Sequence, residues 1–365
     1  MSRYDYLIVG SGLFGATFAN LARDAGKSCL ILEKRPHVAG NCYTDKIQNI
    51  NVHVYGPHIF HTSNKDIWNY VNKFATFNNY VNRPKVKYNN KVYSFPINLF
   101  TLYQLWGCTN PSEAQLKLNQ VKVKIENPQN LEEWVLSQVG EEIYEIFIKG
   151  YTAKQWGKDP KDLPASIIKR LPFRMSFDDN YYSDTYQGVP IGGYTPMVKN
   201  MLGDTPIEFG IDFLKDIDYW SSKANKVIYT GAIDELFDYN QGELEYRSLR
   251  FDMSEVYVED YQGNAIVNYT DLNVPFTRII EHKHFEQTKS KTTIITREYP
   301  QAWDKSKEKC YPINNERNTA LYQRYKSECD TVFPNMILGG RLACYQYLDM
   351  HQVIAQAMHK FPQTL

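Results

Sequence analysis

A glycine-rich loop between two apolar segments near the start of the chain constrains the fold more than any other feature. An apolar run over residues 6–9 leads into Gly10-x-Gly12-x-x-Gly15, and a stretch with helical periodicity follows. A second apolar run then ends at Glu33. This order predicts a strand, a helix and a parallel second strand, the unit that binds a dinucleotide pyrophosphate.

Each of these positions has a physical role in such a unit. Gly10 permits the tight turn, Gly12 lets the backbone approach a pyrophosphate, and Gly15 lets the helix pack on the strand. The helix N-terminus then faces the negative charge. Glu33, eighteen residues after Gly15, is expected to accept a hydrogen bond from the adenosine ribose. The alternative interpretation is a parallel core unit that binds nothing.

Two later segments return to the same pattern, and they favour FAD over NAD. "KVIYTGAID" (226–234) predicts a buried strand that ends in a Thr-Gly turn. "NMILGGRLACYQYLDMHQVIAQAM" (335–358) predicts a strand, a Gly-Gly turn and a helix. A cofactor that is contacted by both ends of a chain is long, and FAD is longer than NAD.

Bulk properties exclude several classes of protein. At 365 residues the chain is long enough for two or three domains. Its 41 basic and 41 acidic residues give zero net charge, so no overall field attracts nucleic acid or a membrane surface. The longest apolar stretch (6–22) is interrupted by glycines and is not expected to span a bilayer. Six scattered cysteines and the lack of a leader favour a reduced, cytoplasmic protein.

The middle of the chain predicts two further structural layers. Residues 98–168 have helical periodicity, with capping boxes expected at Ser112-x-x-Gln115 and Asn130-x-x-Glu133. "PKVKYNNKVYSF" (84–95) and "SEVYVEDYQGNAIVNYTD" (254–271) predict strands that turn at Asn-Asn and at Gln-Gly-Asn, and together an antiparallel sheet.

The expected fold class is therefore α/β, with a discontinuous Rossmann-like FAD-binding domain, a helical domain and an antiparallel β-sheet domain. The predicted boundaries are 1–79, 195–240 and 310–365 for the FAD-binding domain, 99–170 for the helical domain, and 80–98, 171–194 and 241–309 for the sheet domain.

Several candidate site residues lie in these middle layers. Trp156, in the polar segment "GYTAKQWGKDP" (150–160), indicates either a ligand wall or an ordinary helix end. Arg170 and Arg278 stand among apolar residues, so each is expected to be paired or to hold an anion. The 28 tyrosines suit either sheet packing or a surface for sugars and bases.

Three histidines, His53, His58 and His61, lie close together in "HVYGPHIFHT". A metal site would need a carboxylate or thiol at a matching spacing, and the sequence offers none, so no metal is predicted. A loop that lies over a flavin ring is the preferred interpretation.

With these segments assembled, the chain resembles the bacterial UDP-galactopyranose mutases, a family of FAD-dependent flavoproteins, over essentially its whole length. "GYT-x-KQWG" (150–157) and "GR-x5-Y-x-DM" (340–350) are the most specific motifs, supported by "YGPHIFHT" and "PFTRIIEHKHF". One departure is Ala39 in "HVAGN", where the family more often has glycine, which puts one phosphate contact in doubt.

The resemblance implies roles for individual residues. Arg170, Arg278 and His58 would be catalytic, with His58 against the flavin. The residues implied to bind substrate are Phe147, Tyr151, Thr152, Trp156, Tyr181, Asn82, His61, Tyr311, Tyr345, Tyr347 and Asp349; among them Tyr181, Tyr311 and either Tyr345 or Tyr347 would hold the diphosphate. Those implied to bind FAD are Gly10, Gly12, Leu13, Phe14, Gly15, Glu33, Lys34, Gly40, Asn41, His58, Gly231, Gly340, Arg341 and Met350.

The resemblance also implies an activity: interconversion of UDP-galactopyranose and UDP-galactofuranose with no net redox change, by attack of reduced-flavin N5 on the anomeric carbon. It implies a cytoplasmic isomerase, expected to be a homodimer, that uses NAD(P)H or another reductant and supplies galactofuranose for surface polysaccharide. Two other functions stay open, a flavin oxidoreductase of the amine-oxidase type and a flavin-dependent nucleotide-sugar binder without activity.

Overall fold

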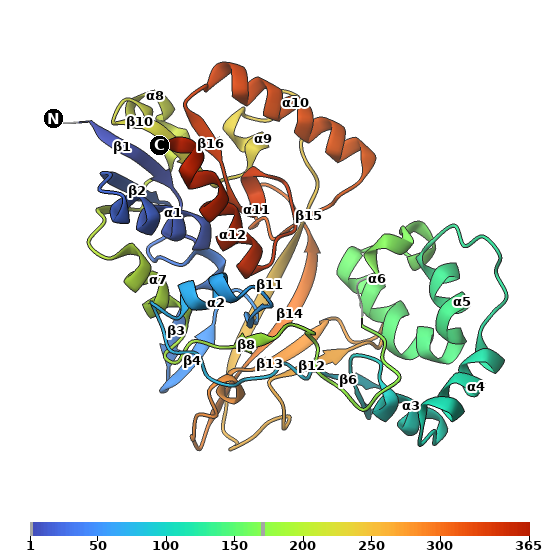
Figure 1. Cartoon of the computed structure of the whole chain (residues 1–365). Coiled ribbons are helices and arrows are strands. Elements are labelled where there is room, and N and C mark those ends of the chain that lie inside the picture. The colour runs from blue at the N-terminus through green and yellow to red at the C-terminus, as the bar shows by residue number, and fades with distance from the viewer. Residues whose placement is uncertain (1–2, 169–171) are drawn as a thin grey trace.

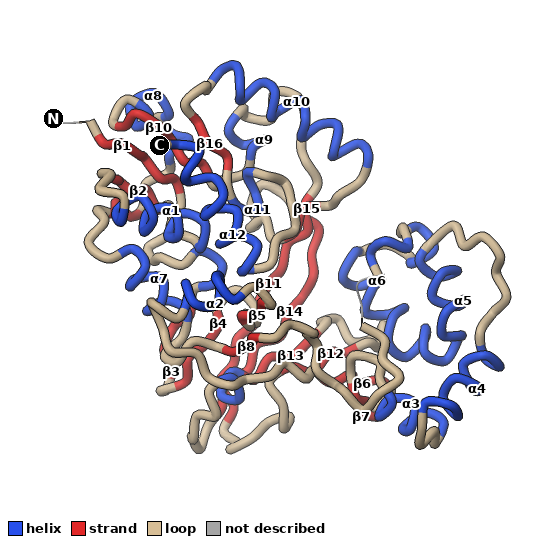
Figure 2. Tube along the Cα trace, viewed as in Figure 1, coloured by secondary structure: helices blue, strands red, loops and turns tan. Residues whose placement is uncertain are grey.

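The computed structural model describes residues 3–168 and 172–365, and it contains two larger sheets and a helical module (Figures 1 and 2). The first sheet is parallel and five-stranded, in the order β16-β10-β1-β2-β9. Its strands are β1 (Tyr4–Val9), β2 (Cys29–Glu33), β9 (Ile207–Phe209), β10 (Ala224–Tyr229) and β16 (Met336–Leu338). The sheet unites segments from both ends of the chain, as the glycine-rich patterns predict.

The predicted strand–helix–strand unit is confirmed. Helix α1 (Leu13–Asp24) joins β1 to β2, and these strands pair in parallel. Buried apolar residues of α1 pack with α7 (Tyr194–Leu202) and α12 (Met350–Lys360) on one face of the sheet. Helix α10 (Glu316–Val332) contributes to the core on the other face. The loop after β1 is therefore held between two packed layers.

The second sheet has seven strands in the order β15-β11-β14-β13-β12-β6-β7. These are β6 (Lys85–Tyr88), β7 (Lys91–Ser94), β11 (Tyr246–Val256), β12 (Ile266–Tyr269), β13 (Arg278–Glu281), β14 (Thr293–Ala302) and β15 (Tyr311–Pro312). The Asn-Asn hairpin is confirmed, since Asn89 and Asn90 have φ of 47° and 61° between the paired strands β6 and β7.

The predicted hairpin through Gln-Gly-Asn (262–264) is wrong. Strand β11 pairs along residues 247–256 with β14 and at its start with β15, so both of its edges are occupied. The chain therefore crosses to β12, which pairs with β13 and, in parallel, with β6. The sheet is antiparallel except at this β6–β12 pair.

The helical module comprises α3 (Leu99–Trp106), α4 (Pro111–Val121), α5 (Leu131–Ile143), a π-helix (Tyr144–Lys149) and α6 (Gly150–Trp156). It confirms the helical prediction for this part of the chain. The box at Ser112 is wrong: Asn110 caps α4 by accepting from the Glu113 N–H at 3.1 Å, because Pro111 occupies the first turn. Asn130 caps α5 as expected, although Glu133 returns to the Gln129 N–H.

The remaining elements are short. The strands are β3 (Thr44–Ile47), β4 (Ile50–His53), β5 (Phe60–Thr62) and β8 (Tyr186–Gly188), and the α-helices are α2 (Lys65–Val71), α8 (Ile217–Ser221), α9 (Ile233–Leu236) and α11 (Gly340–Ala343). Single 3₁₀ turns lie at Gly40–Cys42, Pro160–Asp162, Ala165–Ile167, Phe213–Lys215, His282–Phe285 and Phe361–Thr364.

The seven-stranded sheet lies between the parallel sheet and the helical module in Figure 1. The domain boundaries stay a prediction, and two strand pairs cross them, β5 with β8 and β11 with β15. Within residues 3–168 and 172–365, no helix combines the length and the apolar character needed to cross a membrane.

Candidate active site

The glycine loop after β1 forms a cradle whose shape requires glycine at two positions. Gly10 has φ of 99°, and a Cβ there would lie 2.3 Å from Thr230 Oγ1. A Cβ on Gly15 would lie 2.0 Å from the carbonyl oxygen of Gly10. Because Gly10 and Gly15 carry no Cβ, the turn stays tight and α1 lies close to β1, as the sequence predicts.

Gly12 differs from these two glycines because the space beside it is open. It is the N-cap of α1, with ordinary φ of −69° and no side-chain cap, and no acidic residue lies in the first turn of the helix. The nearest atom to a Cβ on Gly12 would be the Cα of Gly40, 3.9 Å away. A helix N-terminus with unused N–H groups and open space fits a dinucleotide pyrophosphate.

Ala39 and Gly40 form the side of the cradle opposite Gly12. Ala39 has φ of 77° and Gly40 has φ of 52°, so both lie in the left-handed region that favours glycine. Ala39 is strained there, which gives a physical reason for the glycine that the family more often has.

The carboxylate of Glu33 lies beneath the glycine loop, at the end of β2. Its Oε2 accepts hydrogen bonds from the N–H and hydroxyl of Ser11 at 2.9 and 2.6 Å. Its Oε1 accepts from the Arg35 N–H at 2.9 Å. Glu33 therefore fixes the loop, while its bond to a ribose stays a prediction.

The other residues implied to bind FAD lie around this cradle. Arg35 donates to Asn41 Oδ1 at 3.0 Å, and Lys34, largely exposed, pairs with Asp212 at 3.0 Å. The rest lie in the first turn of α1, in the turns after β10 and β16 and at the start of α12: Leu13, Phe14, Gly231, Gly340 and Met350. Their contacts with a cofactor stay predictions.

The histidine loop places His58 in a partly buried setting. Its Nδ1 lies 2.8 Å from the Gly56 carbonyl oxygen, and its backbone N–H donates to His53 Nδ1 at 3.0 Å. The His53 N–H donates in turn to His282 Nδ1 at 3.2 Å. Burial lowers the pKa of His58 to about 4 and of His282 to about 3, and holds that of His53 well below its ordinary value. All three imidazoles are therefore neutral at pH 7.

Arg278 occupies the first position of β13 beside two partners. It donates to the hydroxyl of Tyr151 on α6, and its Nε lies 3.4 Å from Oε1 of the buried Glu298. Nε is buried yet makes no hydrogen bond with any residue that the structure describes. Burial raises the pKa of the Glu298 carboxyl, although the Arg278 charge opposes that rise. The guanidinium therefore retains hydrogen-bonding capacity that Tyr151 and Glu298 do not use.

Two tyrosines and a second arginine lie together near Arg278. The rings of Tyr311 and Tyr347 are 5.8 Å apart. The Arg341 guanidinium carbon lies 5.7 Å from the Tyr311 ring centre and 4.7 Å from that of Tyr347. Arg341 also donates to the Leu348 carbonyl oxygen at 2.7 Å and helps to lower the pKa of His58. It therefore lies between the histidine loop and these tyrosines.

Tyr345 does not belong to this group, so its predicted contact with the diphosphate is wrong. Its side chain is buried in the core beside β10 and α10. Its hydroxyl donates toward the carbonyl oxygens of Glu245 and Ile313 at 2.6 and 3.1 Å and accepts from the Ile313 N–H. Of the two alternatives that the resemblance left open, the structure retains Tyr347.

His61 forms a dyad that sequence reasoning did not find. Its Nδ1 lies 2.7 Å from Asp184 Oδ2, and its ring stacks on Tyr182 with centres 3.7 Å apart. His351 lies edge-on to His61 at 4.9 Å, and its buried Nδ1 has no partner within the described residues. Asp184 was missed because it is 123 residues from His61, and the pairing of β5 with β8 brings them together.

The helical module supplies the remaining predicted residues. Tyr151 and Thr152 lie on α6, and Trp156 ends that helix, partly buried against the core of the module. Phe147, in the π-helix, is buried against Tyr93, 5.5 Å away between ring centres. Phe147 is therefore mainly a core residue, and its contact with a ligand stays a prediction.

Of the remaining predicted residues, Asn82 and Tyr181 lie at the junction of the module and the sheet, and Asp349 lies at α12. Asn82 is buried, and its Oδ1 has no hydrogen-bond partner in the part of the chain that the structure describes. Its carbonyl oxygen accepts from the Tyr181 N–H at 2.8 Å. Asp349 is the N-cap of α12, where its N–H donates to Gln352. Arg170 lies outside the described residues.

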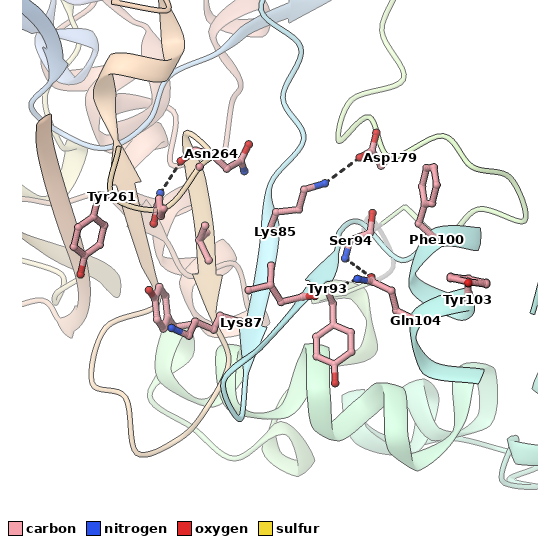
Figure 3. A pocket seen from close by; sticks show the side chains of 15 residues that line it. Lys85, Lys87, Tyr93, Ser94, Phe100, Tyr103, Gln104, Asp179, Tyr261 and Asn264 are labelled. Carbon is pink, nitrogen blue, oxygen red and sulfur yellow. Dashed lines mark hydrogen bonds and ion pairs between the residues drawn. The ribbon is translucent and has the colours of Figure 1, made fainter. Parts of the chain in front are cut away.

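A cavity of about 920 Å³ lies elsewhere, on the face of the seven-stranded sheet beside α3 (Figure 3). Lys85, which pairs with Asp179 at 3.1 Å, and Lys87 line it together with Tyr93 and Tyr103. It includes none of the residues predicted for the site. We assign the candidate site to the residues above because Arg341 lies near enough to influence the pKa of both His58 and Tyr311, and Arg278 likewise influences the pKa of Tyr311.

The fold and this arrangement define an α/β protein with a Rossmann-like fold, whose candidate site also contains a cluster of arginine and tyrosine side chains. A family model described as UDP-galactopyranose mutase matches residues 146–347, and one described as an NAD(P)-binding Rossmann-like domain matches residues 8–74. The first covers more than half of the chain. The chain belongs to the UDP-galactopyranose mutase family.

Similar proteins extend this likeness to the whole chain. A dTDP-fucopyranose mutase of Escherichia coli is 40% identical over 96% of each chain. A probable UDP-galactopyranose mutase of Klebsiella pneumoniae is 41% identical over 98% of this chain and 94% of its own. A crystal structure of reduced UDP-galactopyranose mutase shares the fold, with a TM-score of 0.76 at 14% identity over 100% and 94% of the two chains. A structure of a putrescine oxidase variant gives a TM-score of 0.58 at 11% identity over 99% of this chain and 98% of its own.

The neutral histidines predict acid sensitivity of the fold. Because the folded-state pKa of His58 is lowered, the unfolded chain binds more protons below pH 6.5, and stability falls as pH drops. Between pH 7 and pH 5 we expect His58 alone to cost about 2 kcal/mol in the free energy of unfolding. Urea unfolding of wild type and His58→Asn at both pH values measures this, with the exposed His359→Asn as control. Equal pH dependence in all three would contradict it.

Trp156 predicts a fluorescence signal. If its ring lies against the nucleotide, UDP should quench the intrinsic emission, and Trp156→Ala should lose most of that quench. The chain has six tryptophans, so the difference between wild type and variant is the quantity to measure. Trp106→Phe, on α3, is the matched control. A quench that is unchanged in Trp156→Ala would assign Trp156 to the core alone.

Proposed function

We propose that the protein is a UDP-galactopyranose mutase that interconverts UDP-galactopyranose and UDP-galactofuranose with FAD as cofactor. The observation that carries this proposal is Arg278, whose buried Nε is unsatisfied while Tyr151, Tyr311 and Tyr347 lie around it. A buried cation with unused hydrogen-bonding capacity suits a diphosphate. Family membership supports the choice of a nucleotide sugar.

The cradle at Gly12 and Gly40 would hold the FAD pyrophosphate, with Glu33 at the ribose and His58 against the ring. Reduced FAD, when bound, supplies the nucleophile through its N5 atom. His58 is neutral, so it would add no positive charge beside the ring. Its Nδ1 is fixed toward Gly56, which leaves Nε2 for a ligand.

The chain's own contribution to the reaction is orientation and charge. Arg278, with Arg170 as a second candidate, would neutralise the diphosphate as UDP leaves the anomeric carbon. Tyr311, Tyr347 and Tyr181 would donate hydrogen bonds from their hydroxyl groups to the same anion. Trp156 and Tyr151 would line the nucleotide side, and Asp349 with His61 would lie on the sugar side.

The unpaired buried oxygens fit such a ligand. Asn82 Oδ1, Gln155 Oε1 and Asn268 Oδ1 are buried acceptors without a partner in the described residues. Asn268 lies directly opposite Arg278 in the β12–β13 pair, and Gln155 is on α6. Buried polar atoms are rarely unsatisfied unless a ligand or water completes them. Sugar and ribose hydroxyls are donors of the kind that these oxygens lack.

The test is interconversion of the furanose and pyranose forms of the nucleotide sugar by the purified, flavin-loaded protein. We expect the dithionite-reduced protein to convert UDP-galactofuranose to UDP-galactopyranose without consuming reductant, and the oxidised protein to be nearly inactive. dTDP-fucopyranose belongs in the same assay, because relatives at 40% and 41% identity have names with different nucleotide sugars. Loss of one reductant per product would favour the oxidoreductase alternative, and UDP binding without conversion would favour the silent binder.

The surroundings of the enzyme are part of the proposal. It would be a cytoplasmic homodimer, reduced by NAD(P)H or another donor, and its product would serve surface polysaccharide. Light scattering of the purified protein measures the oligomeric state, and a mass of one chain would contradict the dimer.

A further inference from the structure

Lys154 is enclosed by carbonyl oxygens. Its Nζ donates to the backbone oxygens of Tyr269, Asp271, Val274 and Phe276 at 2.8, 2.9, 2.9 and 2.9 Å. The lysine lies on α6, and all four oxygens belong to the segment 269–276, which connects β12 to β13. An ammonium group has three N–H donors, so these oxygens use its full hydrogen-bonding capacity.

The enclosed segment leads directly into Arg278. After Phe276, the Thr277 N–H donates to the Glu298 carbonyl oxygen at 2.9 Å, and Arg278 is the first residue of β13. The same helix contacts Arg278 itself, because the guanidinium donates to the hydroxyl of Tyr151. Helix α6 therefore holds both the arginine side chain and the backbone that precedes it.

Two further features hold α6 close to this part of the sheet. A Cβ on Gly150 would lie 1.9 Å from the Thr270 carbonyl oxygen, so glycine is required for the approach. At the other end of the helix, Arg247 Nε donates to the Gln155 carbonyl oxygen at 2.9 Å, and its Nη2 donates to that of Lys154 at 3.4 Å. Cationic side chains at a helix C-terminus stabilise it.

We propose that Lys154 is a positioning residue for Arg278: its ammonium group gathers the carbonyl oxygens of segment 269–276 and so sets the place of the guanidinium relative to the substrate diphosphate. This inference rests on the proposed function, because that function gives Arg278 its role. Lys154 touches neither substrate nor cofactor in this proposal. It acts through the backbone of 269–276 and through α6.

Backbone carbonyl oxygens are the hydrogen-bond acceptors of the Lys154 ammonium group. Burial lowers the pKa of Lys154 to about 8, and the nearby carboxylate of Asp271 opposes that shift. At pH 7 the group remains an ammonium ion. Four carbonyl oxygens at about 2.9 Å resemble the settings in which proteins bind K⁺, so a small cation could replace the lysine head.

The first experiment is rescue of Lys154→Ala by added cations at pH 7. We expect kcat/KM to fall about 10²-fold, because small misplacement of a catalytic group costs that much. Added methylammonium or ammonium should raise kcat/KM of the variant at least about tenfold, and the effect should saturate with cation concentration. Tetramethylammonium at the same ionic strength should not raise it. Lys161→Ala, which removes an exposed lysine from the turn Pro160–Asp162 beyond α6, should behave as wild type.

The second experiment combines variants. Because Lys154 acts through Arg278, Lys154→Ala should cost little further activity in an Arg278→Ala background. The proposal would be overturned if the double variant lost activity by the product of the two single losses. It would also be overturned if kcat/KM of Lys154→Ala lay within twofold of that of wild type. Lys154→Met, which keeps the apolar stem, replaces Lys154→Ala if that variant is unfolded. If neither variant folds, Lys154 is a folding residue and the positioning role is overturned as well.

Hydrogen exchange separates this inference from the proposed function. In Lys154→Met, amides of residues 269–278 should exchange at least about tenfold faster than in wild type, while amides of the glycine loop should not change. This readout needs no turnover. A wild-type protein without mutase activity would overturn the proposed function only, and unchanged exchange in an active protein would overturn the enclosure by Lys154 only.

Discussion

Arg278→Ala is expected to lower turnover about 10² to 10³-fold while FAD stays bound. The side chain lies on β13 with Tyr151 and Glu298 as its partners, and the cofactor cradle is built by other strands. Loss of one preorganised cation at a leaving diphosphate should therefore affect the rate and leave the flavin spectrum unchanged. Steady-state kinetics with the reduced protein, together with the flavin-to-protein ratio, measure both quantities.

A buried carboxylate complicates this variant, so the design includes a second one. Removing Arg278 leaves Glu298 buried without its cation, which by itself destabilises a protein. Arg278→Ala combined with Glu298→Gln removes the charge of both partners and should recover stability but not activity. Arg250→Ala, an exposed arginine that covers the Tyr299 ring at 3.9 Å on the same sheet, is the matched control. Near-normal turnover in folded, FAD-loaded Arg278→Ala would remove the role from Arg278.

The parts of the fold that the sequence predicted are those with local causes. The glycine spacing required the turn after β1, and the Asn-Asn pair required the hairpin of β6 and β7, because few other residues adopt positive φ. The Gln-Gly-Asn segment has similar turn chemistry, yet its flanking strands do not pair. The choice of partner for β11 is made by a ten-residue ladder with β14, which no local pattern reveals.

The candidate site divides in the same way. Glycines, histidines and arginines are recognisable from spacing and from the family motifs, so Gly12, His58 and Arg278 could be predicted as candidates. Glu298, Asp184 and the carbonyl oxygens around Lys154 were not, because their roles depend on residues about 20 to 120 positions away. Tyr345 and Tyr347 show the limit of motif-based prediction. They stand two positions apart in one motif, yet Tyr345 is buried in the core and Tyr347 lies beside Arg341.

Gly12→Val is expected to give a folded protein without flavin. Gly12 has φ of −69° and extended ψ, which valine adopts readily. Apart from its chain neighbours and its own helix, no atom of the described residues lies nearer than 3.9 Å to the added Cβ. The side chain would instead fill the space that the pyrophosphate is proposed to use. Overpacking costs about 1–3 kcal/mol, and 3 kcal/mol corresponds to about 10²-fold weaker FAD binding.

Gly15→Val supplies the contrast that makes this test specific. Its Cβ would lie 2.0 Å from the Gly10 carbonyl oxygen, a backbone atom that cannot move without opening the turn. We therefore expect Gly15→Val to lower the melting temperature of the apoprotein strongly, and Gly12→Val to leave it near that of wild-type apoprotein. Titration of both apoproteins with FAD, followed by flavin fluorescence, gives the affinities. If Gly12→Val bound FAD as tightly as wild type, the open space at the N-terminus of α1 would not be the pyrophosphate site, and the cradle would have to be placed elsewhere along the carboxyl ends of the parallel strands.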